Sequence, residues 1–249
     1  MADDSPLVYF VLGATGSGRR DVLADLIANG LPADAGAQVL LAAGEAASDA
    51  DDRLPVIGRW SLEGERLSTP EIAGSGDLFI VSDGRGNPVD QLEALKPWME
   101  RHGFALARVV CVVNCQLAEA NPALLAWYDA CIHFSDVVLL ANRDGVANKW
   151  LSDFQSHFRD QFMPALFEMV KQGRVKNPAL VLDPQPRRLS HYFDEDEDWL
   201  IDGVGEEDDA EIEAGTEEVE VTKVEDPYFA RRVGGRREKE IPAIADFLG

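Results

Sequence analysis

Residues 7–20 read Leu-Val-Tyr-Phe-Val-Leu-Gly-Ala-Thr-Gly-Ser-Gly-Arg-Arg, an apolar run followed at once by a glycine-rich turn. Six apolar residues without polar alternation are typical of a strand that is buried on both faces. Gly13 and Gly18 have the G-x-x-x-x-G spacing of a phosphate-binding loop, with Gly16 between them. In such a loop, backbone N–H groups face a phosphate and the next helix adds its positive N-terminal end. The stretch therefore predicts a strand, an anion-binding loop and a helix.

Apolar runs of the same kind recur along the 249 residues and alternate with segments of helical character. The runs predict strands at residues 7–12, 39–42, 77–81, 108–113, 136–141 and 179–182, with a short strand near Val56 in an otherwise loop-like stretch. Helices are expected at residues 21–29, 89–102, 122–133 and 148–172, the last one kinked or split by Pro164. This alternation predicts an α/β fold of the P-loop NTPase type, with a mainly parallel sheet flanked by helices.

The loop departs from the usual pattern at its last two positions. Arg19 stands where the phosphate-binding lysine is expected, and Arg20 replaces the serine or threonine that ligates magnesium. Arginine binds phosphate bidentately, but it does not ligate a metal ion. We expect the N–H groups of Gly16, Ser17, Gly18 and Arg19 to hold a phosphate or a nucleotide, with little dependence on magnesium. The alternative is a tight turn that binds nothing.

A second polar turn, Asp83-Gly84-Arg85-Gly86, follows the predicted strand at residues 77–81. GTPases use a D-x-x-G turn at this place to hold magnesium through water and to contact the γ-phosphate. Asp83 is therefore the candidate catalytic residue, and an ordinary Asp-Gly turn is the alternative.

A third turn, Asn142-Arg143-Asp144-Gly145, follows the predicted strand at residues 136–141. Guanine-binding GTPases place an N-K-x-D motif here, in which the carboxylate accepts hydrogen bonds from the base. Asn142 and Asp144 are two residues apart rather than three, so either register breaks the motif. Both are kept as candidate nucleotide-binding residues, next to the alternative of a polar loop that ends a strand.

Taken in order, these motifs resemble the CobW/HypB/UreG class of P-loop GTPases, and within it the CobW-like metallochaperones. Residues 13–23 are similar to the class motif G-x-x-G-x-G-K-T-T-L-L. Residues 78–88 resemble its E-T-S-G-x-x-D-P strand end, with Gly84 and Pro88 matching and Val81 at the glutamate position. Residues 109–116 and 134–140 resemble its V-V-x-V-V-D and F-A-D-x-x-L-L blocks, and residues 177–179 its L-N-P-x-A motif. The resemblance implies a GTPase fold that binds GTP or ATP with magnesium.

The departures from that class point to a degenerate member. The C-x-C-C metal motif of the class is missing before Cys111, the lysine and the magnesium hydroxyl are replaced, and its β-rich C-terminal domain has no counterpart. We therefore favour a pseudo-GTPase that binds phosphate or nucleotide and acts through protein partners. The alternative is an active GTP or ATP hydrolase of the CobW-like metallochaperone type.

Charge is distributed unevenly along the chain, whose net charge is −22. Residues 194–226 contain 17 acidic residues and a single base, whereas residues 227–249 contain five bases and three acids. An acidic protein of this kind repels nucleic acid and anionic membrane, so neither is expected as a partner. Three cysteines without a C-x-x-C pair predict no disulfide framework and no metal site. The acidic N-terminus lacks the basic start of a targeting peptide, which favours the cytoplasm.

The chain accordingly divides into three parts: a P-loop domain at residues 1–193, an acidic linker at residues 194–226 and a docking segment at residues 227–249. The linker has too few apolar side chains to fold, so we expect it to be disordered. The docking segment carries aromatic and apolar residues around a basic middle. We expect it to bind a protein partner in trans, so that removing residues 194–249 leaves the melting temperature nearly unchanged. The alternatives are docking on the chain's own body or on a second copy, and a frayed terminus.

Overall fold

The computed structural model describes residues 6–32, 35–72, 76–194 and 225–248. Its strands are β1 (Leu7–Leu12), β2 (Ala37–Ala42), β3 (Val56–Glu63), β4 (Arg66–Ser68), β5 (Asp77–Val81), β6 (Ala105–Asn114), β7 (Val137–Ala141) and β8 (Leu166–Met169). Its helices are α1 (Arg19–Gly30), α2 (Pro88–His102), α3 (Cys115–Ala120), α4 (Leu125–His133), α5 (Asn148–Asp160) and α6 (Pro178–Leu182). Three short 3-10 turns are η1 (Asp51–Arg53), η2 (Pro122–Leu124) and η3 (Ile244–Phe247).

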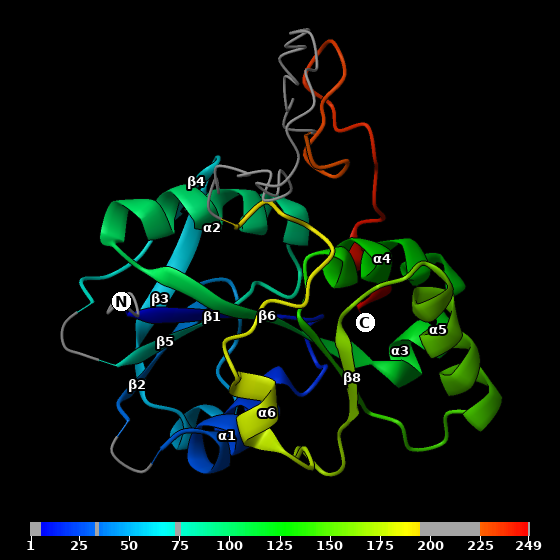
Figure 1. The fold of residues 1–249 in the computed structure, drawn as a ribbon, viewed down its shortest axis with the longest axis horizontal. Helices are drawn as coiled ribbons and strands as arrows, with labels where there is room; N and C mark the ends of the chain where they lie inside the picture. The colour runs from blue at the N-terminus through cyan, green and yellow to red at the C-terminus, as the bar shows by residue number, and fades with distance from the viewer. Residues whose placement is uncertain (1–5, 33–34, 73–75, 195–224, 249) are drawn as a thin grey trace, which may run out of the picture.

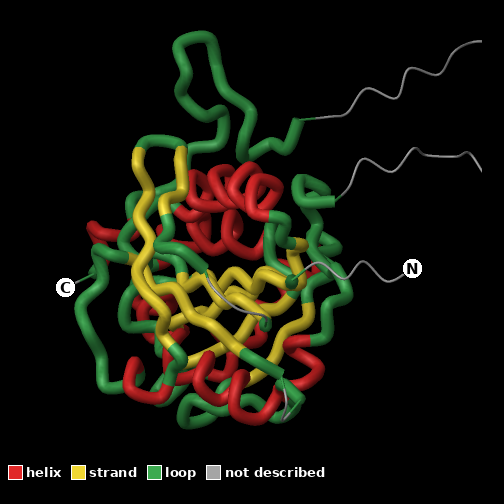
Figure 2. Tube along the Cα trace, turned by 90° about the vertical axis from the view of Figure 1, so that its left-hand side faces the viewer, coloured by secondary structure: helices red, strands yellow, loops and turns green. Residues whose placement is uncertain are grey.

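The strands form one sheet in the order β4-β3-β2-β5-β1-β6-β7-β8. All neighbours are parallel except β3 and β4, which pair in antiparallel fashion. Helices α2 and α4 cover one face of the sheet, and α1 and α6 cover the other (Figures 1 and 2). The predicted α/β fold of the P-loop NTPase type, with a mainly parallel sheet flanked by helices, is confirmed.

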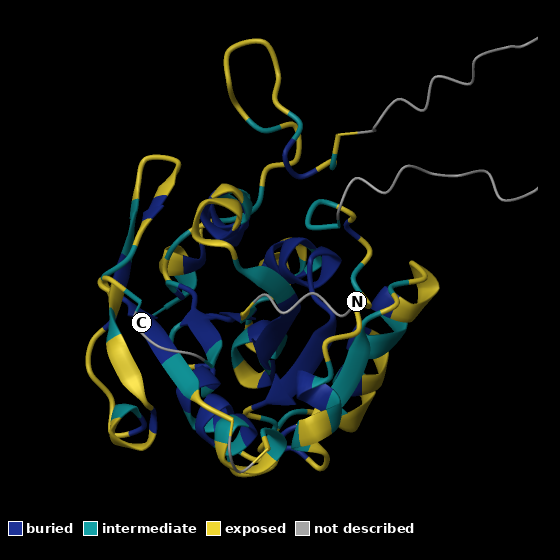
Figure 3. Cartoon of the chain, turned by 60° about the vertical axis from the view of Figure 1, so that its left-hand side comes forward, coloured by how far each residue is buried: buried dark blue, intermediate teal, exposed yellow. Residues whose placement is uncertain are grey.

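Alternate residues of β1 point into the two halves of the core. Val8 and Phe10 pack in the same cluster as the apolar side chains of α2, α4 and α5. Tyr9 and Val11 pack with the side chains of α1 and α6. The central strands are therefore buried on both faces, as the absence of polar alternation predicted, and the buried residues fill the middle of the molecule (Figure 3).

Two sequence-based assignments were wrong, and the reasons are local. Residues 179–182 form helix α6 rather than a strand, because Asn177 caps the segment by accepting a hydrogen bond from the N–H of Leu180 (3.3 Å) and Pro178 fits the first helical turn. The expected helix at residues 148–172 ends at Asp160, and its second half contains β8. Short apolar runs fit a strand or a helix equally well, and Pro164 separates the two elements.

The loop-like stretch at residues 44–76 contains more order than the sequence indicated. The short strand expected near Val56 is the eight-residue β3, and β4 pairs with it in the register Leu62 to Leu67. Trp60 of β3 is buried and donates from its indole nitrogen to the carbonyl oxygen of Val81 (2.8 Å). The parallel pairing of β3 with β2 and the buried Trp60 side chain therefore both join this hairpin to the central strands.

The C-terminal segment packs on the chain's own domain, which differs from the docking in trans that we expected. Tyr228, Phe229 and Ile244 are buried in the same core cluster as α2 and α4. Asp226, assigned above to the linker, accepts hydrogen bonds from His133 Nε2 (2.8 Å) and Ser190 Oγ (2.6 Å). The apolar residues of the segment thus find a surface within the chain. The expected disorder concerns residues 195–224, which lie outside the described ranges, and stays a prediction.

Charged groups hold the same segment from its outer side. Arg237 forms ion pairs with Asp90 (2.6 Å) and with Glu93 of α2, and its guanidinium lies over the ring of Phe229. Burial by itself would raise the pKa of Asp226, but the hydrogen bonds from His133 and Ser190 outweigh it and lower that pKa.

Within the described part of the chain, no helix has the length and apolar character to cross a membrane.

Candidate phosphate-binding loop and neighbouring cavity

The glycine-rich loop lies at the carboxyl end of β1, where the chain turns into α1. β1 is paired with β5 on one side and β6 on the other, although the next strand in sequence is β2. This is a topological switch point, the place where open α/β sheets bind ligands. Gly16 and Gly18 have φ angles of 80° and 82°, which residues with a Cβ atom rarely adopt. The local backbone therefore matches the predicted strand, loop and helix.

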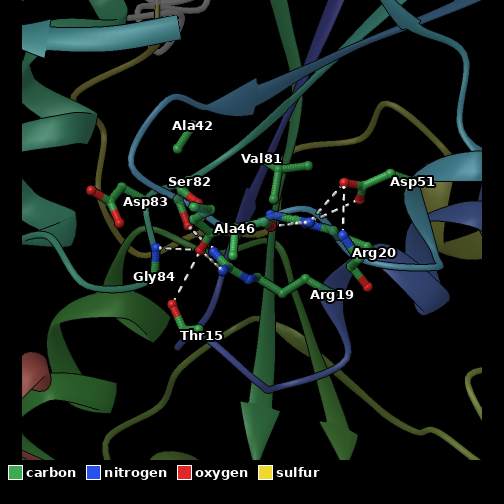
Figure 4. Close-up of polar contacts among 12 residues, drawn as sticks. Thr15, Arg19, Arg20, Ala42, Ala46, Asp51, Val81, Ser82, Asp83 and Gly84 are labelled. Atoms are coloured by element: carbon green, nitrogen blue, oxygen red, sulfur yellow. Dashed lines mark hydrogen bonds and ion pairs between the residues drawn. The ribbon is translucent and has the colours of Figure 1, made fainter. Parts of the chain in front are cut away.

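Arg19, however, does not reach over the loop. Its side chain is 3% exposed and points toward the end of β5. Nη1 donates to the carbonyl oxygen (2.7 Å) and to Oγ (3.0 Å) of Ser82, and Nη2 pairs with Glu45. Burial lowers the pKa of the Arg19 guanidinium, and the Glu45 carboxylate acts in the opposite direction. The cation expected to bind a phosphate is thus held by groups of the protein itself (Figure 4).

Glu45 is the anion at the centre of this arrangement. Its Oε1 accepts hydrogen bonds from the N–H of Gly84 (2.9 Å), from Thr15 Oγ1 (3.2 Å) and from Arg19. Its Oε2 accepts from Arg20 Nη2 (2.7 Å). Burial alone would raise the pKa of Glu45, but Arg19, the Gly84 N–H and Arg20 together lower it, so the carboxylate is ionised. We call Arg19, Arg20 and Glu45 the arginine–glutamate cluster.

Arg20 is fixed on two sides. Besides Glu45 it pairs with Asp51 of η1, where Nη1 lies 2.9 Å from Oδ1, and it donates to the carbonyl oxygen of Ala46 (2.9 Å). Two guanidinium groups and two carboxylates thus neutralise one another through charge-assisted hydrogen bonds. A side chain so engaged at the usual magnesium position supplies no oxygen ligand.

Gly84 makes the closest backbone approach to the loop. Its carbonyl oxygen accepts from the N–H of Thr15 (3.1 Å), while its own N–H donates to Glu45. A Cβ at position 84 would lie 2.4 Å from both the Thr15 nitrogen and Arg19 Nη2, so only glycine fits. The N–H of Ser17 also donates inside the protein, to the carbonyl oxygen of Ala14 (3.1 Å). Two of the loop N–H groups are therefore committed to protein acceptors.

Asp83 faces away from the arginine–glutamate cluster. Its Oδ1 accepts from the N–H of Arg85 (2.9 Å), an Asx turn, and a Cβ on Gly44 would lie 3.5 Å from its Oδ2. Among the described residues, no three His, Cys, Asp or Glu side chains are grouped closely enough to hold a metal ion. With Arg20 in an ion pair, the donors near the loop do not fit a magnesium ion.

A cavity of about 1,040 Å³ opens beside the loop, between one side of α1, from its first turn to Asn29, and the carboxyl ends of β7 and β8. It is lined on one side by Ser17, Gly18 and Asp21 and on the other by Asn142, Asp144 and residues 170–174. Ser17 is fully buried, and its Oγ has no hydrogen-bond partner among the described residues. The cavity is thus large, polar and adjacent to the loop, but it does not include the arginine–glutamate cluster.

The structure brings Asn142 and the loop together. Asn142 has a φ of 50°, and its Nδ2 donates to the carbonyl oxygen of Gly16 (3.0 Å). Asn114, at the end of β6, approaches the same carbonyl oxygen at 3.5 Å. Asp144 is exposed at the cavity, where its backbone carbonyl accepts from Gln116 Nε2 (2.6 Å). The third turn is therefore placed beside the loop, and the roles predicted for its residues in nucleotide binding stay predictions.

The predicted site residues thus fall into two groups. Ser17, Gly18, Asn142 and Asp144 line the cavity, whereas Arg19 and Arg20 belong to the cluster and Asp83 to neither. Glu45 was missed by the sequence analysis, because it lies in a loop-like stretch without any motif. Its only signal was indirect: two adjacent arginines after the loop require a nearby anion.

Neither a family model nor a curated protein matches the chain. Two solved structures are similar to it, both of the YjiA GTPase with Zn(II) bound. One is the E. coli protein, at 12% sequence identity, and the other is a triple mutant of YjiA GTPase, at 14%. Each has a TM-score of 0.42 and covers 74% of this chain and 67% of its own. The fold assigned here rests on the strand order and on the position of the glycine-rich loop.

Proposed function

We propose that this chain is a pseudo-GTPase, a degenerate relative of the CobW/HypB/UreG class whose phosphate position is filled by its own glutamate. One observation carries the proposal: Glu45 accepts hydrogen bonds from Arg19, Arg20 and the Gly84 N–H at once. Arg19 stands at the position of the phosphate-binding lysine, Gly84 lies in the turn expected to contact the γ-phosphate, and Arg20 occupies the position of the magnesium ligand. Because the Glu45 carboxylate already accepts hydrogen bonds from these groups, they are not available to a bound phosphate.

The energetic consequence is a barrier to triphosphate binding. A γ-phosphate that took this place would have to displace Glu45 and leave its carboxylate in search of another partner. Breaking a buried ion pair costs about 3–5 kcal/mol, which corresponds to a loss of roughly 10²–10⁴-fold in affinity. Phosphoryl transfer depends on positioning and on electrostatic stabilisation, chiefly by magnesium and a lysine or arginine. Since Arg20 offers no metal ligand and Asp83 faces elsewhere, we expect no significant GTP or ATP hydrolysis.

The adjacent cavity supports a second candidate, an active GTP or ATP hydrolase of the CobW-like type. Its volume of about 1,040 Å³ lies at the upper end of the range typical of small-molecule sites. Asn142 and Asp144 at its wall are the residue types that bind a purine base. In this second reading a nucleotide enters the cavity and displaces Glu45 as it closes the site.

Calorimetric titration distinguishes the two candidates. GTP, GDP and ATP are titrated into the full-length protein with and without magnesium, and phosphate release is measured in parallel. The pseudo-GTPase proposal expects weak or absent binding that does not depend on magnesium, and no release above buffer. Magnesium-stimulated turnover that disappears in the Asp83→Ala variant would support the hydrolase instead.

Action through a protein partner remains part of the proposal, and the surface available for it differs from the one the sequence suggested. The aromatic residues of the C-terminal segment are buried in the domain, but a hairpin at residues 231–237, closed by the bridge between Arg231 and Arg237, projects from it within the orange and red segment of Figure 1. Val233 at its tip is fully exposed. We expect a partner to contact this basic hairpin, in the cytoplasm, where the acidic chain is predicted to reside.

A further inference from the structure

The sheet ends on a strand whose outer side is open. β8 pairs only with β7, as the last strand in the order. The N–H groups of Leu166 and Val170 donate to β7-side carbonyl oxygens, those of Asp136 and Leu140 (both 2.9 Å). Because alternate residues of a strand bond to opposite sides, the N–H and C=O groups of Phe167 and Met169 point away from β7. No element among the described residues pairs with them.

Apolar side chains surround this open edge. Phe162, between α5 and β8, is 88% exposed and has a φ of 56°, a conformation that is unfavourable for an aromatic residue. Met169 is 38% exposed, and Phe167 packs against Phe158 of α5 with ring centroids 5.8 Å apart. An exposed aromatic in a strained backbone next to unpaired strand groups marks an interaction surface.

We propose that this edge pairs with the same edge of a second copy, antiparallel and with the two-fold axis at Phe167. Phe167 then faces Phe167 of the other copy, and Ala165 faces Met169 of the other copy. All three have outward-pointing backbone groups, so each facing pair can exchange two hydrogen bonds. Pro164, which has no N–H, falls at a position that needs none.

The side chains favour that register over the neighbouring one. An axis at Glu168 would place two glutamates directly opposite each other, which is destabilising. With the axis at Phe167, Glu168 instead faces Leu166, while Ala165, Phe167 and Met169 of both copies share the apolar face toward α5. The local charge allows two copies to approach each other at this edge. Residues 159–174 contain three bases and two acids, although the whole chain has a net charge of −22.

The size of the contact predicts a weak dimer. Stable complexes bury about 800 Å² on each partner, and five paired residues with one flanking aromatic cover less than that. Each cross-strand apolar pair contributes about 0.2–1 kcal/mol. The overall negative charge opposes association at long range, so added salt should strengthen the dimer.

Sedimentation velocity of the full-length protein over a wide concentration range, with amide hydrogen exchange, tests the pairing. We expect reversible dimerisation that strengthens with salt and slower exchange of the Phe167 and Met169 amides at high concentration. The Met169→Glu variant should weaken association roughly tenfold or more, because it places a charge in the shared apolar face. Phe162→Ser, which changes only an exposed side chain, should weaken it less.

The matched control is Ile57→Glu, which adds the same charge at an equally exposed apolar residue (39%, against 38% for Met169), on β3 near the other edge of the sheet. It should dimerise as the unmodified protein does. A protein that is monomeric at every concentration and salt would overturn the proposal. So would a dimer in which the Phe167 and Met169 amides exchange as fast as in the monomer, since its interface would lie elsewhere.

Discussion

Replacing Glu45 tests whether the arginine–glutamate cluster fills the phosphate position. We consider two variants, Glu45→Gln, which keeps the shape and removes the charge, and Glu45→Ala, which also opens the space. In both, Arg20 keeps its ion pair with Asp51 (2.9 Å). Arg19 keeps only neutral acceptors, the carbonyl oxygen and Oγ of Ser82. The perturbation therefore leaves one buried guanidinium without a countercharge.

The expected loss of stability follows from this one uncompensated guanidinium. Removing one partner of a buried ion pair costs about 3–5 kcal/mol, because the remaining charge is left uncompensated. For a protein of this size, 1 kcal/mol shifts the melting temperature by about 2–4 °C, so we expect Glu45→Ala to melt roughly 6–20 °C below the unmodified protein. The loss is a large part of the roughly 5–15 kcal/mol by which proteins of this kind are stable.

A gain of anion binding should accompany the loss of stability. In Glu45→Ala the Arg19 guanidinium and the Gly84 N–H become free, and inorganic phosphate or GDP can take the place of the carboxylate. At a ligand concentration of 100 times Kd, binding restores about 2.7 kcal/mol. Thermal unfolding followed by tryptophan fluorescence should therefore show phosphate raising the melting temperature of the variant and leaving that of the unmodified protein unchanged.

The control is Asp153→Ala, which removes the partner of Lys149 in an exposed ion pair on α5. Exposed pairs contribute about 0–1 kcal/mol, so this variant should melt close to the unmodified protein and show no response to phosphate. The reasoning is refuted if Glu45→Ala melts no lower than Asp153→Ala, or if phosphate and GTP stabilise the unmodified protein as strongly as they stabilise the Glu45 variants.

Three further predictions concern other parts of the fold. Removing residues 195–249 should lower the free energy of unfolding by several kcal/mol, because three large side chains worth about 1.5–3 kcal/mol each lose their burial; an unchanged urea midpoint would contradict this. Asp226 has a lowered pKa in the folded state, so its stabilisation is complete above its ordinary pKa near 3.9 and is lost as pH falls below it. Unfolding measured against pH should show Asp226→Asn less stable at neutral pH and less sensitive to acid, and parallel curves would exclude that role. Gly84→Ala should destabilise the protein strongly, because the new methyl group would lie 2.4 Å from the Thr15 nitrogen. If a denaturant titration gave the stability of the unmodified protein, the loop backbone would have to move away from the methyl group at little cost, contrary to this prediction.

The central fold was predictable because its strands are unusually uniform. β1, β5 and β7 are almost wholly apolar and show no polar alternation, a pattern that is typical of strands covered on both faces. The predicted secondary structure was wrong where a single residue decides it. Asn177 caps a helix in an apolar run that is equally compatible with a strand. Pro164 was recognised as a breaker, but the apolar spacing of residues 150–166 continued across it and concealed β8.

The site was predictable only where it is local in sequence. The loop, its glycines and the position of Asn142 next to it follow from strand–turn–helix patterns. Glu45 is 26 residues from Arg19, in a segment without a motif, and only the parallel pairing of β2 with β5 brings it to the cluster. The docking of the C-terminal segment was missed for the same reason: its aromatic residues indicate burial, but they do not indicate against which surface.

The two substitutions at the loop, Arg19 and Arg20, are best explained together with Glu45. A lysine and a threonine at positions 19 and 20 would suit a bound phosphate and a magnesium ion, which bring their own charges with the ligand. Two arginines there have no such ligand to neutralise them, and in a buried site an uncompensated cation is costly. Glu45 provides that compensation permanently, with its carboxylate shared between the two guanidinium groups and the Gly84 N–H. If Glu45 fills the phosphate position as we propose, the chain itself holds the loop in its folded geometry, and we expect the loop conformation not to change when nucleotide is added. On this proposal the protein would offer a partner one constant surface rather than a switch between two states.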